Sequence, residues 1–311
     1  MTTQSNASNP EVRKTGLGGS DCAVILGMSP WKTRYELYLE KTGEREAPDL
    51  SSNESVYWGT VHEEAVAKRY AERMDCKVRR NNRTLRLSSH PFMMAHIDRE
   101  VVGKSIGLEC KTADSRFADQ WGDEFTSDIP EYYLLQCLHY LCVTGYAEWH
   151  LAVLVGGNRH RIYIIKRQDF GDEIDQLPEV ELEFWQRVQD KVSPDPETLG
   201  DIALRWPKDT GTQVQASPSI VAAVTDLVSV RERKKALEEQ EKELRFVVLA
   251  ALGEGAELLQ GDTRLLTYKA QTTRRIDTER LKAEYPIIAA ALETETTSRV
   301  LRFPPAKKEK K

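Results

Sequence analysis

Apolar residues recur at helical spacing in three segments near the start of the chain, each bounded by residues that favour helix ends. The predicted helices are residues 20–27 with Ser20 as N-cap, residues 33–42 ending at Gly43, and residues 55–74. On the third helix we expect Val56, Ala67 and Tyr70 to face inward. The first part of the chain is therefore predicted to be helical.

Short segments with strand character follow, bounded by Asn, Pro or Gly. The predicted strands are residues 77–80, 84–87, 92–98 and 105–111, with a turn at residues 102–105. A helix over residues 129–144, ended by Gly145, precedes a predicted hairpin of residues 149–155 and 159–165. Helices followed by strands and a crossover helix predict an α+β core.

A change in residue composition after this core, from alternating strands to a proline-rich stretch, predicts a domain boundary. A helix containing residues 180–188 leads into a proline-rich stretch, and a long charged helix is predicted beyond it over residues 218–252. Its apolar residues Val230, Leu237 and Leu244 are seven apart, but Lys234 and Glu241 at partner positions weaken the coiled-coil signal. A hairpin over residues 258–269 completes a small module, so we expect domains at residues 1–206 and 207–311.

Composition narrows the class of protein. The 311 residues include 44 Lys and Arg against 49 Asp and Glu, and this net charge of -5 disfavours a nonspecific DNA-coating protein. No apolar run approaches the ~20 residues that span a bilayer, and residues 1–10 lack a signal core, so we expect a cytoplasmic protein without membrane contact. Five cysteines without a CxxC motif disfavour four-cysteine zinc or iron–sulfur sites, and the histidines show no zinc-like spacing.

Candidate chemistry lies between Asp98 and Lys111. If Asp98 and Glu109 occupy partner strands of a hairpin, their carboxylates converge, and Lys111 shares a strand face with Glu109. Two carboxylates suit Mg²⁺, and a lysine beside them can orient water and offset charge on a phosphate. A surface aspartate with a Glu–Lys pair is the alternative, because this spacing is common by chance.

Two further segments have alternative interpretations. Glu63 lies on the third predicted helix after Gly59, a residue that costs about 1 kcal/mol in a helix and so indicates close packing. Taken alone, Glu63 is a solvated helix glutamate. Ser20 opens a helix, where free N–H groups can bind phosphate, but an ordinary N-cap explains it equally.

Taken together, the segments resemble the YqaJ-type viral recombinase family, relatives of phage lambda exonuclease within the PD-(D/E)xK nuclease superfamily. The matching motifs, in family order over about residues 13–165, are Arg13 with GLGGSD, ILGMSPW, WG through Glu63, Ile97-Asp98, LECK ending at Lys111, and YYLLQ through the VTG that ends at Gly145. The resemblance implies a restriction-endonuclease-like core, with a central mixed sheet flanked by helices, plus a C-terminal helical and hairpin module.

The resemblance also assigns roles. Asp98, Glu109 and Glu63 correspond to metal-binding carboxylates, the backbone carbonyl of Cys110 to a further ligand, and Lys111 to the catalytic lysine, with two Mg²⁺ ions that Mn²⁺ can replace. The groups that hold the 5′-phosphate of the substrate are assigned to Arg13, Ser20 and Gln136. His96 stands in place of a serine, while Leu138 and Tyr140 stand in place of glutamines, so only Gln136 is carried over from that helix.

The implied activity is a Mg²⁺-dependent 5′-to-3′ exonuclease on linear double-stranded DNA. It would leave 3′ single strands for a single-strand annealing protein in phage-type recombination. The resemblance further implies a ring-like homo-oligomer, a trimer, encoded by a phage or prophage and acting in the bacterial cytoplasm. The alternatives are a non-catalytic DNA-end or partner-binding module on a nuclease fold, and another DNA-repair or CRISPR-adaptation-type nuclease of the same superfamily.

Three other features have open interpretations. Trp31 is either a platform for a terminal base or a core aromatic. The lysine-rich tail, residues 307–311, would contribute at most nonspecific attraction to nucleic acid. A basic stretch is either a contact for DNA phosphates or a solvated hairpin, and it comprises Lys77, Arg79, Arg80, Arg83 and Arg86.

Overall fold

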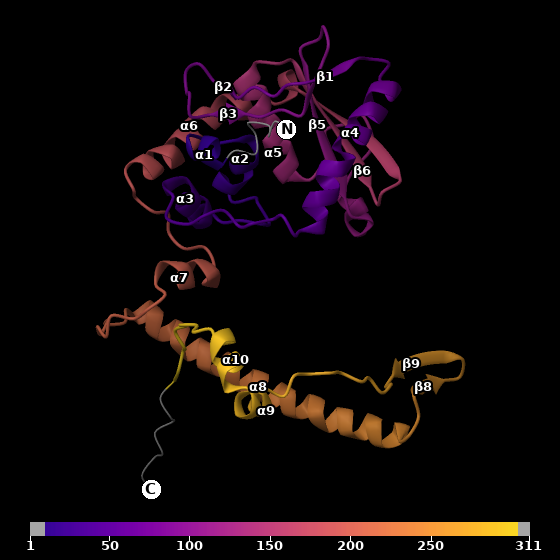
Figure 1. The fold of residues 1–311 in the computed structure, drawn as a ribbon, viewed down its shortest axis with the longest axis vertical. Helices are drawn as coiled ribbons and strands as arrows, with labels where there is room; N and C mark the ends of the chain where they lie inside the picture. The colour runs from indigo at the N-terminus through magenta and orange to yellow at the C-terminus, as the bar shows by residue number, and fades with distance from the viewer. Residues whose placement is uncertain (1–9, 304–311) are drawn as a thin grey trace. The chain divides into compact units, whose positions relative to one another are not determined.

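The computed structural model describes residues 10–303, so the lysine-rich tail lies outside the described residues. The chain divides into two compact units, Met1–Trp206 and Pro207–Lys311 (Figure 1). Among the described helices, none combines the length and apolarity needed to cross a membrane.

A five-stranded sheet with the order β1-β4-β5-β6-β7 forms the centre of the first unit. The strands are β1 (Val78–Arg80), β4 (Arg99–Val101), β5 (Ile106–Ala113), β6 (Glu148–Val155) and β7 (Arg159–Lys166). Strands β5 and β6 are parallel, whereas the other neighbours are antiparallel. The predicted α+β core with a mixed central sheet flanked by helices is therefore confirmed.

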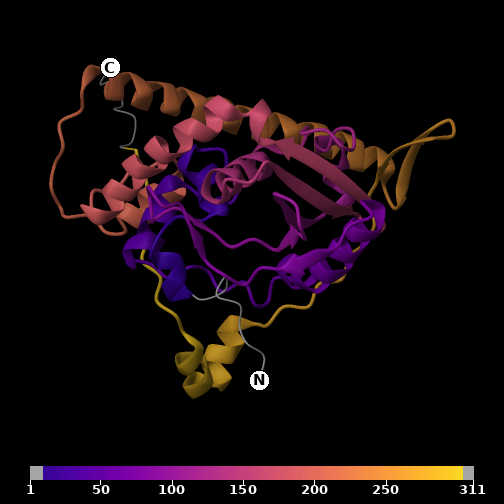
Figure 2. The ribbon, with the colours of Figure 1, turned by 90° about the horizontal axis from the view of Figure 1, so that it is seen from above.

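The two faces of the sheet pack against different helices, as the period-two alternation of strand side chains requires. Ala152 on β6 packs with Val66, Ala67 and Tyr70 of α4 (Glu54–Arg73). The neighbouring β6 residues Leu151 and Val153 pack instead with α5 (Glu131–Thr144). Figures 1 and 2 show α4 and α5 on opposite sides of the sheet.

The helices α1 (Pro10–Lys14), α2 (Gly19–Ile25) and α3 (Arg34–Thr42) lie on the α5 side, with α6 (Gly171–Gln189) packed against α2, α3 and α5. Thr33 caps α3 by accepting the amide of Glu36, and Gly43 ends the helix with a φ of 76°, as its sequence predicts. For α2 the predicted N-cap was wrong. Gly18 is the N-cap, and Ser20 lies exposed in the first turn.

Two other predictions also need correction. The segment predicted as one strand over residues 92–98 is divided, because β3 (Met94–Ala95) pairs with β2 (Leu85–Arg86) while the chain continues into β4 of the main sheet. Val56 does not face inward: its exposed fraction is 43 %, and the buried residues of α4 begin only at Val66, where the helix meets the sheet.

The second unit follows a short helix, α7 (Leu199–Arg205), that ends the first. It consists of the long helix α8 (Pro218–Leu252), a hairpin and two short helices, and none of its described residues is buried. The remaining elements are β8 (Glu257–Gln260), β9 (Thr263–Thr267), α9 (Thr278–Glu284) and α10 (Pro286–Leu292).

Candidate active site

Strand β5 brings Glu109 and Lys111 together on the face that packs against α5. The Oε1 atom of Glu109 lies 2.6 Å from Nζ of Lys111. The same oxygen accepts a hydrogen bond of 2.8 Å from Nε2 of Gln136, which lies on α5. Leu108 and Cys110 point to the other face, toward α4, so alternation along one strand separates the polar cluster from the apolar contact.

Asp98 joins this cluster from the neighbouring strand. It immediately precedes β4, whose Arg99 is paired with Leu108 of β5. The Oδ2 atom of Asp98 accepts a hydrogen bond of 2.9 Å from the backbone amide of Cys110. The structure thus brings Asp98, Glu109 and Lys111 to one place in the sheet, in the arrangement that the hairpin spacing predicts.

The two carboxylates of this cluster lie close to a single lysine. Burial raises the pKa of Asp98 to about 8, with further repulsion from the Glu109 carboxylate. Burial alone would lower the pKa of Lys111. The carboxylates of Glu109 and Asp98 outweigh burial and raise this pKa above its usual value. Near neutral pH the Asp98 carboxyl therefore keeps its proton, and a cation bound beside it would favour the ionised carboxylate.

The residues of this cluster fit a divalent cation. Oε2 of Glu109 is buried and has no hydrogen-bond partner among the described residues, which is a costly state for a carboxylate oxygen. Hard oxygen ligands of this kind suit Mg²⁺. In the part of the chain that the structure describes, no three His, Cys, Asp or Glu side chains form a ready-made metal centre. The fit therefore rests on the pair Asp98 and Glu109.

Glu63 is held beside this pair by an arginine. Its Oε1 atom accepts a hydrogen bond of 2.7 Å from Nη1 of Arg99, and this guanidinium also binds Glu64 and the carbonyl of Asp98. Glu63 lies near enough to contribute to the raised pKa of Asp98.

The close packing predicted at Gly59 is not found. A Cβ added at Gly59 would meet Thr112 only at an ordinary 3.7 Å, so close packing does not explain that glycine.

Sequence reasoning missed Arg99, whose side chain is only 4 % exposed. Its position next to Asp98 was the only signal, and the partners that bind it come from a helix far away in the sequence. The contact between Gln136 and Glu109 was missed for the same reason, although Gln136 had been assigned to phosphate binding.

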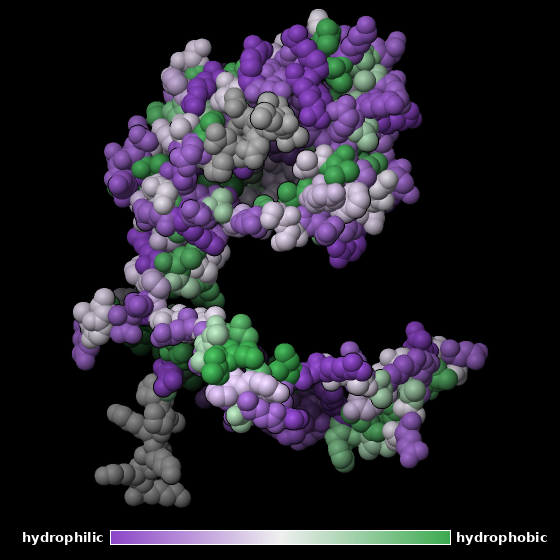
Figure 3. Space-filling view, viewed as in Figure 1, coloured by the Kyte–Doolittle hydropathy of each residue, from purple (hydrophilic) through white to green (hydrophobic). Residues whose placement is uncertain are grey.

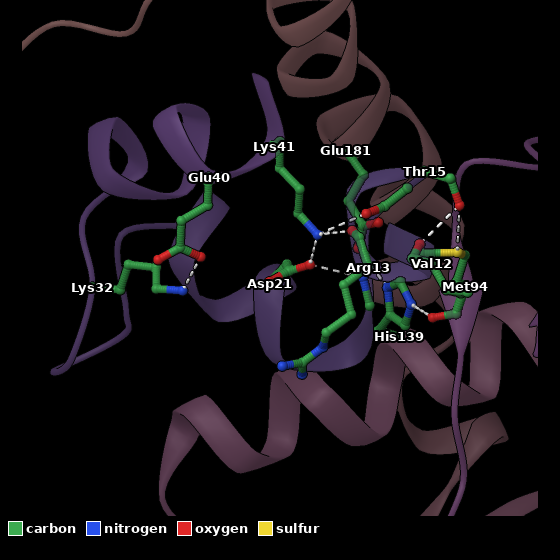
Figure 4. Close-up of polar contacts among 12 residues, drawn as sticks. Val12, Arg13, Thr15, Asp21, Lys32, Glu40, Lys41, Met94, His139 and Glu181 are labelled. Carbon is green, nitrogen blue, oxygen red and sulfur yellow. Dashed lines mark hydrogen bonds and ion pairs between the residues drawn. The ribbon is translucent and has the colours of Figure 1, made fainter. Parts of the chain in front are cut away.

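The three residues assigned to the 5′-phosphate lie on adjoining segments. Helix α2 approaches α5 so closely that a Cβ at Gly19 would lie 3.1 Å from Cγ of Gln136, which places Ser20 next to that contact. Arg13 is exposed at the end of α1 (Figure 4), and its charge contributes to the lowered pKa of His96, after the larger effect of burial. His96 itself contacts Thr84 at 2.9 Å.

The two remaining sequence candidates are also placed. Trp31 is 67 % exposed and is therefore not a core aromatic. Its ring lies 4.6 Å from that of Tyr132, and the next ring, Tyr133, lies 5.2 Å from Nζ of Lys111. In the basic stretch, Arg79 and Arg80 form ion pairs with Glu100 and Glu64, so part of its charge is neutralised within the protein.

Comparisons with known proteins identify the family of this chain. Residues 10–147 match the model of the YqaJ-like viral recombinase domain. The uncharacterized protein YqaJ of Bacillus subtilis (strain 168) is 33% identical over 293 residues, which cover 91% of this chain and 89% of that protein.

Solved structures with a similar fold include two exonucleases. The alkaline exonuclease of Laribacter hongkongensis is 14% identical with a TM-score of 0.46, covering 58% of this chain and 93% of that one. A phage related exonuclease from Haemophilus somnus 129PT is 12% identical with a TM-score of 0.41, covering 59% and 99%. On the strength of the family match and the Bacillus relative, the chain belongs to the YqaJ-like viral recombinase domain family.

Proposed function

We propose that this protein is a Mg²⁺-dependent 5′-to-3′ exonuclease that acts on linear double-stranded DNA. Membership of the viral recombinase family supports a nuclease function. The observation that carries the proposal is the convergence of Asp98, Glu109 and Lys111, where Oε2 of Glu109 is buried and has no hydrogen-bond partner among residues 10–303. In metal-assisted phosphodiester hydrolysis, carboxylates hold the metal ion and a lysine can stabilise charge on the phosphate.

Asp98, Glu109 and Glu63 would hold two metal ions, with the backbone carbonyl of Cys110 as a further ligand. When bound, Mg²⁺ or Mn²⁺ neutralises charge on the phosphate and lowers the pKa of bound water. Lys111 orients the attacking water and stabilises charge that develops on the phosphate oxygens. Gln136 holds the Glu109 carboxylate in place through its 2.8 Å hydrogen bond.

The DNA end would be positioned by the groups beside α2. Arg13 offers a charged donor with two parallel N–H groups for a 5′-phosphate, and Ser20, in the first turn of α2, offers a hydroxyl. Trp31 provides an exposed ring on which a terminal base can stack. The product, a 3′ single strand, would pass to a single-strand annealing protein, and the enzyme would work as a ring-like homo-oligomer.

The test is digestion of linear duplex labelled at either end, with Mg²⁺ and with a chelator. We expect Mg²⁺-dependent loss of the 5′-ended strand, while covalently closed circles resist. Release from the 3′ end would reverse the proposed polarity. Rapid cutting of closed circles would replace the exonuclease with an endonuclease at the same site, and binding without any cutting would indicate a non-catalytic DNA-end module.

A further inference from the structure

A buried ion pair lies beside the proposed phosphate-binding groups without being one of them. Nζ of Lys41, in the last turn of α3, lies 2.7 Å from Oδ2 of Asp21 on α2 (Figure 4). The exposed fractions of the two side chains are 7% and 15%. Burial would raise the pKa of the Asp21 carboxyl, but Lys41 and the amide of Gly18 outweigh this and lower it, so this carboxyl is ionised at neutral pH.

The ammonium group of Lys41 has three partners, one for each of its hydrogens. Besides Asp21, it donates to the carbonyl of Arg13 at 2.8 Å and to the carbonyl of Gly16 at 2.7 Å. Asp21 in turn accepts the backbone amide of Gly18 at 2.9 Å. One ion pair therefore fixes three backbone groups, at Arg13 near the end of α1 and at Gly16 and Gly18 before α2.

This segment carries the groups assigned to the DNA end. Arg13 stands at its start and Ser20 just after it. Figure 4 shows the Arg13 side chain leading away from Lys41, and among residues 10–303 no side chain forms a hydrogen bond or ion pair with its guanidinium. The backbone of Arg13 is thus held by Lys41, while its charged end stays available.

We propose that Lys41 is a positioning residue that holds Arg13 in place to bind the 5′-phosphate of DNA, an inference that rests on the proposed function. Lys41 does not meet the phosphate itself, because all its donors are used and Asp21 balances its charge. By binding the backbone carbonyl of Arg13, it fixes the position from which the Arg13 side chain extends. A guanidinium binds a phosphate through two parallel hydrogen bonds only when it is placed accurately.

The structure supplies a matched control. Lys32 forms an ion pair with Glu40 on α3, the helix that carries Lys41 (Figure 4). Lys32 contacts neither Arg13 nor Gly16. Lys32→Met therefore removes a neighbouring ion pair of similar type without releasing the segment between α1 and α2.

The experiment compares digestion rates of linear duplex carrying a 5′-phosphate or a 5′-hydroxyl, using the full chain. The wild type should prefer the phosphate, and Lys41→Met should reduce that preference about tenfold by raising KM for phosphorylated ends. The rate on hydroxyl ends should fall far less, and Lys32→Met should keep the wild-type preference. Adding Lys41→Met to an Arg13→Ala background should change the preference no further, because Lys41 acts through Arg13.

Thermal unfolding of each variant shows whether it is folded. If Lys41→Met does not fold, Lys41→Arg retains the pairing with Asp21 but cannot reproduce three contacts from one nitrogen, and the same loss of preference is expected. A folded variant with unchanged preference, or equal losses on both kinds of end, would overturn the inference. A wild type that cuts DNA without preferring a phosphate would overturn it together with the phosphate pocket. A wild type that cuts no DNA would instead reject the proposed function.

Discussion

The two units of the chain are built in opposite ways. The first contains three buried apolar clusters and every residue of the candidate site. The second has no buried residue among those described, and Figure 3 shows hydrophobic side chains on its surface. Ile287 and Leu292 of α10, for example, are 85% and 71% exposed. The first unit is therefore shaped by burial, the second by local helix and turn preferences.

The long helix α8 illustrates this difference. It is 35 residues long, starts at a Ser217 cap, and carries exposed ion pairs such as Lys234–Glu238. Leu237 and Leu244 are 64% and 60% exposed, so its apolar residues contribute little to folding. Chemistry and stability should consequently respond strongly to changes in the first unit and weakly to changes in the second.

The largest effect is expected from Lys111→Ala. Without the lysine, the water and the developing charge lose their cation, and cleavage of linear duplex should fall about a thousandfold or more. DNA binding in the presence of Mg²⁺, measured by fluorescence anisotropy, should persist. Lys242→Ala on α8 is the control and should cut at the wild-type rate. Equal losses of binding and cleavage would instead make Lys111 a structural residue.

Next in size is the loss of metal binding in Asp98→Ala or Glu109→Ala. Each change removes an oxygen ligand, so calorimetric titration with Mg²⁺ or Mn²⁺ should show clearly weaker binding. Asp226→Ala in the second unit, a carboxylate on the exposed surface of α8, should bind metal as the wild type does. Metal affinity that is unchanged in both site variants would contradict the assigned ligands.

A smaller effect, on stability, is expected from His139→Leu. Nδ1 of His139 lies 2.7 Å from Glu181, and Nε2 donates to the carbonyl of Met94. Removing the imidazole leaves Glu181 buried without its partner and should lower the free energy of unfolding by about 3 kcal/mol in urea titrations. By contrast, Lys234→Leu breaks an exposed pair and should cost less than about 1 kcal/mol. A loss that is equally small in both variants would remove the contrast between the units.

The same histidine gives a pH dependence with a definite sign. Burial lowers the pKa of His139, but the Glu181 carboxylate outweighs burial and raises it above the usual 6.5. Its contribution to stability is therefore complete below pH 6.5 and is lost as the pH rises through the folded-state pKa. As the pH rises above 6.5, the free energy of unfolding of the wild type should fall more steeply than that of His139→Leu. Parallel pH profiles would show that the histidine is not charged in the folded protein.

Much of the first unit was predictable because its signals are local. Thr33 and Gly43 mark the ends of α3 by capping chemistry, and period-two alternation alone places Glu109 and Lys111 on one face of β5. The family motifs added the candidate roles, which the chain's spacing could not supply. Helix ends and strand faces could be predicted from the sequence because each depends on residues within a short segment.

Features that depend on distant segments could not be predicted. Val56 is exposed because α4 extends beyond the sheet, and no pattern within the helix shows where the sheet ends. Ser20 is not the N-cap because the Asp21 carboxylate, which is held by Lys41 of α3, accepts the amide of Gly18, so α2 starts earlier in the chain. The Arg99–Glu63 pair likewise joins a strand to a helix.

The smallest effect on chemistry is expected from removing the second unit. A chain ending near Pro207 retains all the candidate site residues and the three buried clusters, so it should fold and still cut linear duplex at a rate close to that of the full chain. We expect the truncated chain to lose assembly or partner docking instead, which light scattering would measure. The control is the same truncation carrying Lys111→Ala, which should be inactive. If the truncated chain is folded but does not cut DNA, the second unit completes the active site or the DNA channel, and the contrast between a catalytic and an accessory unit no longer holds.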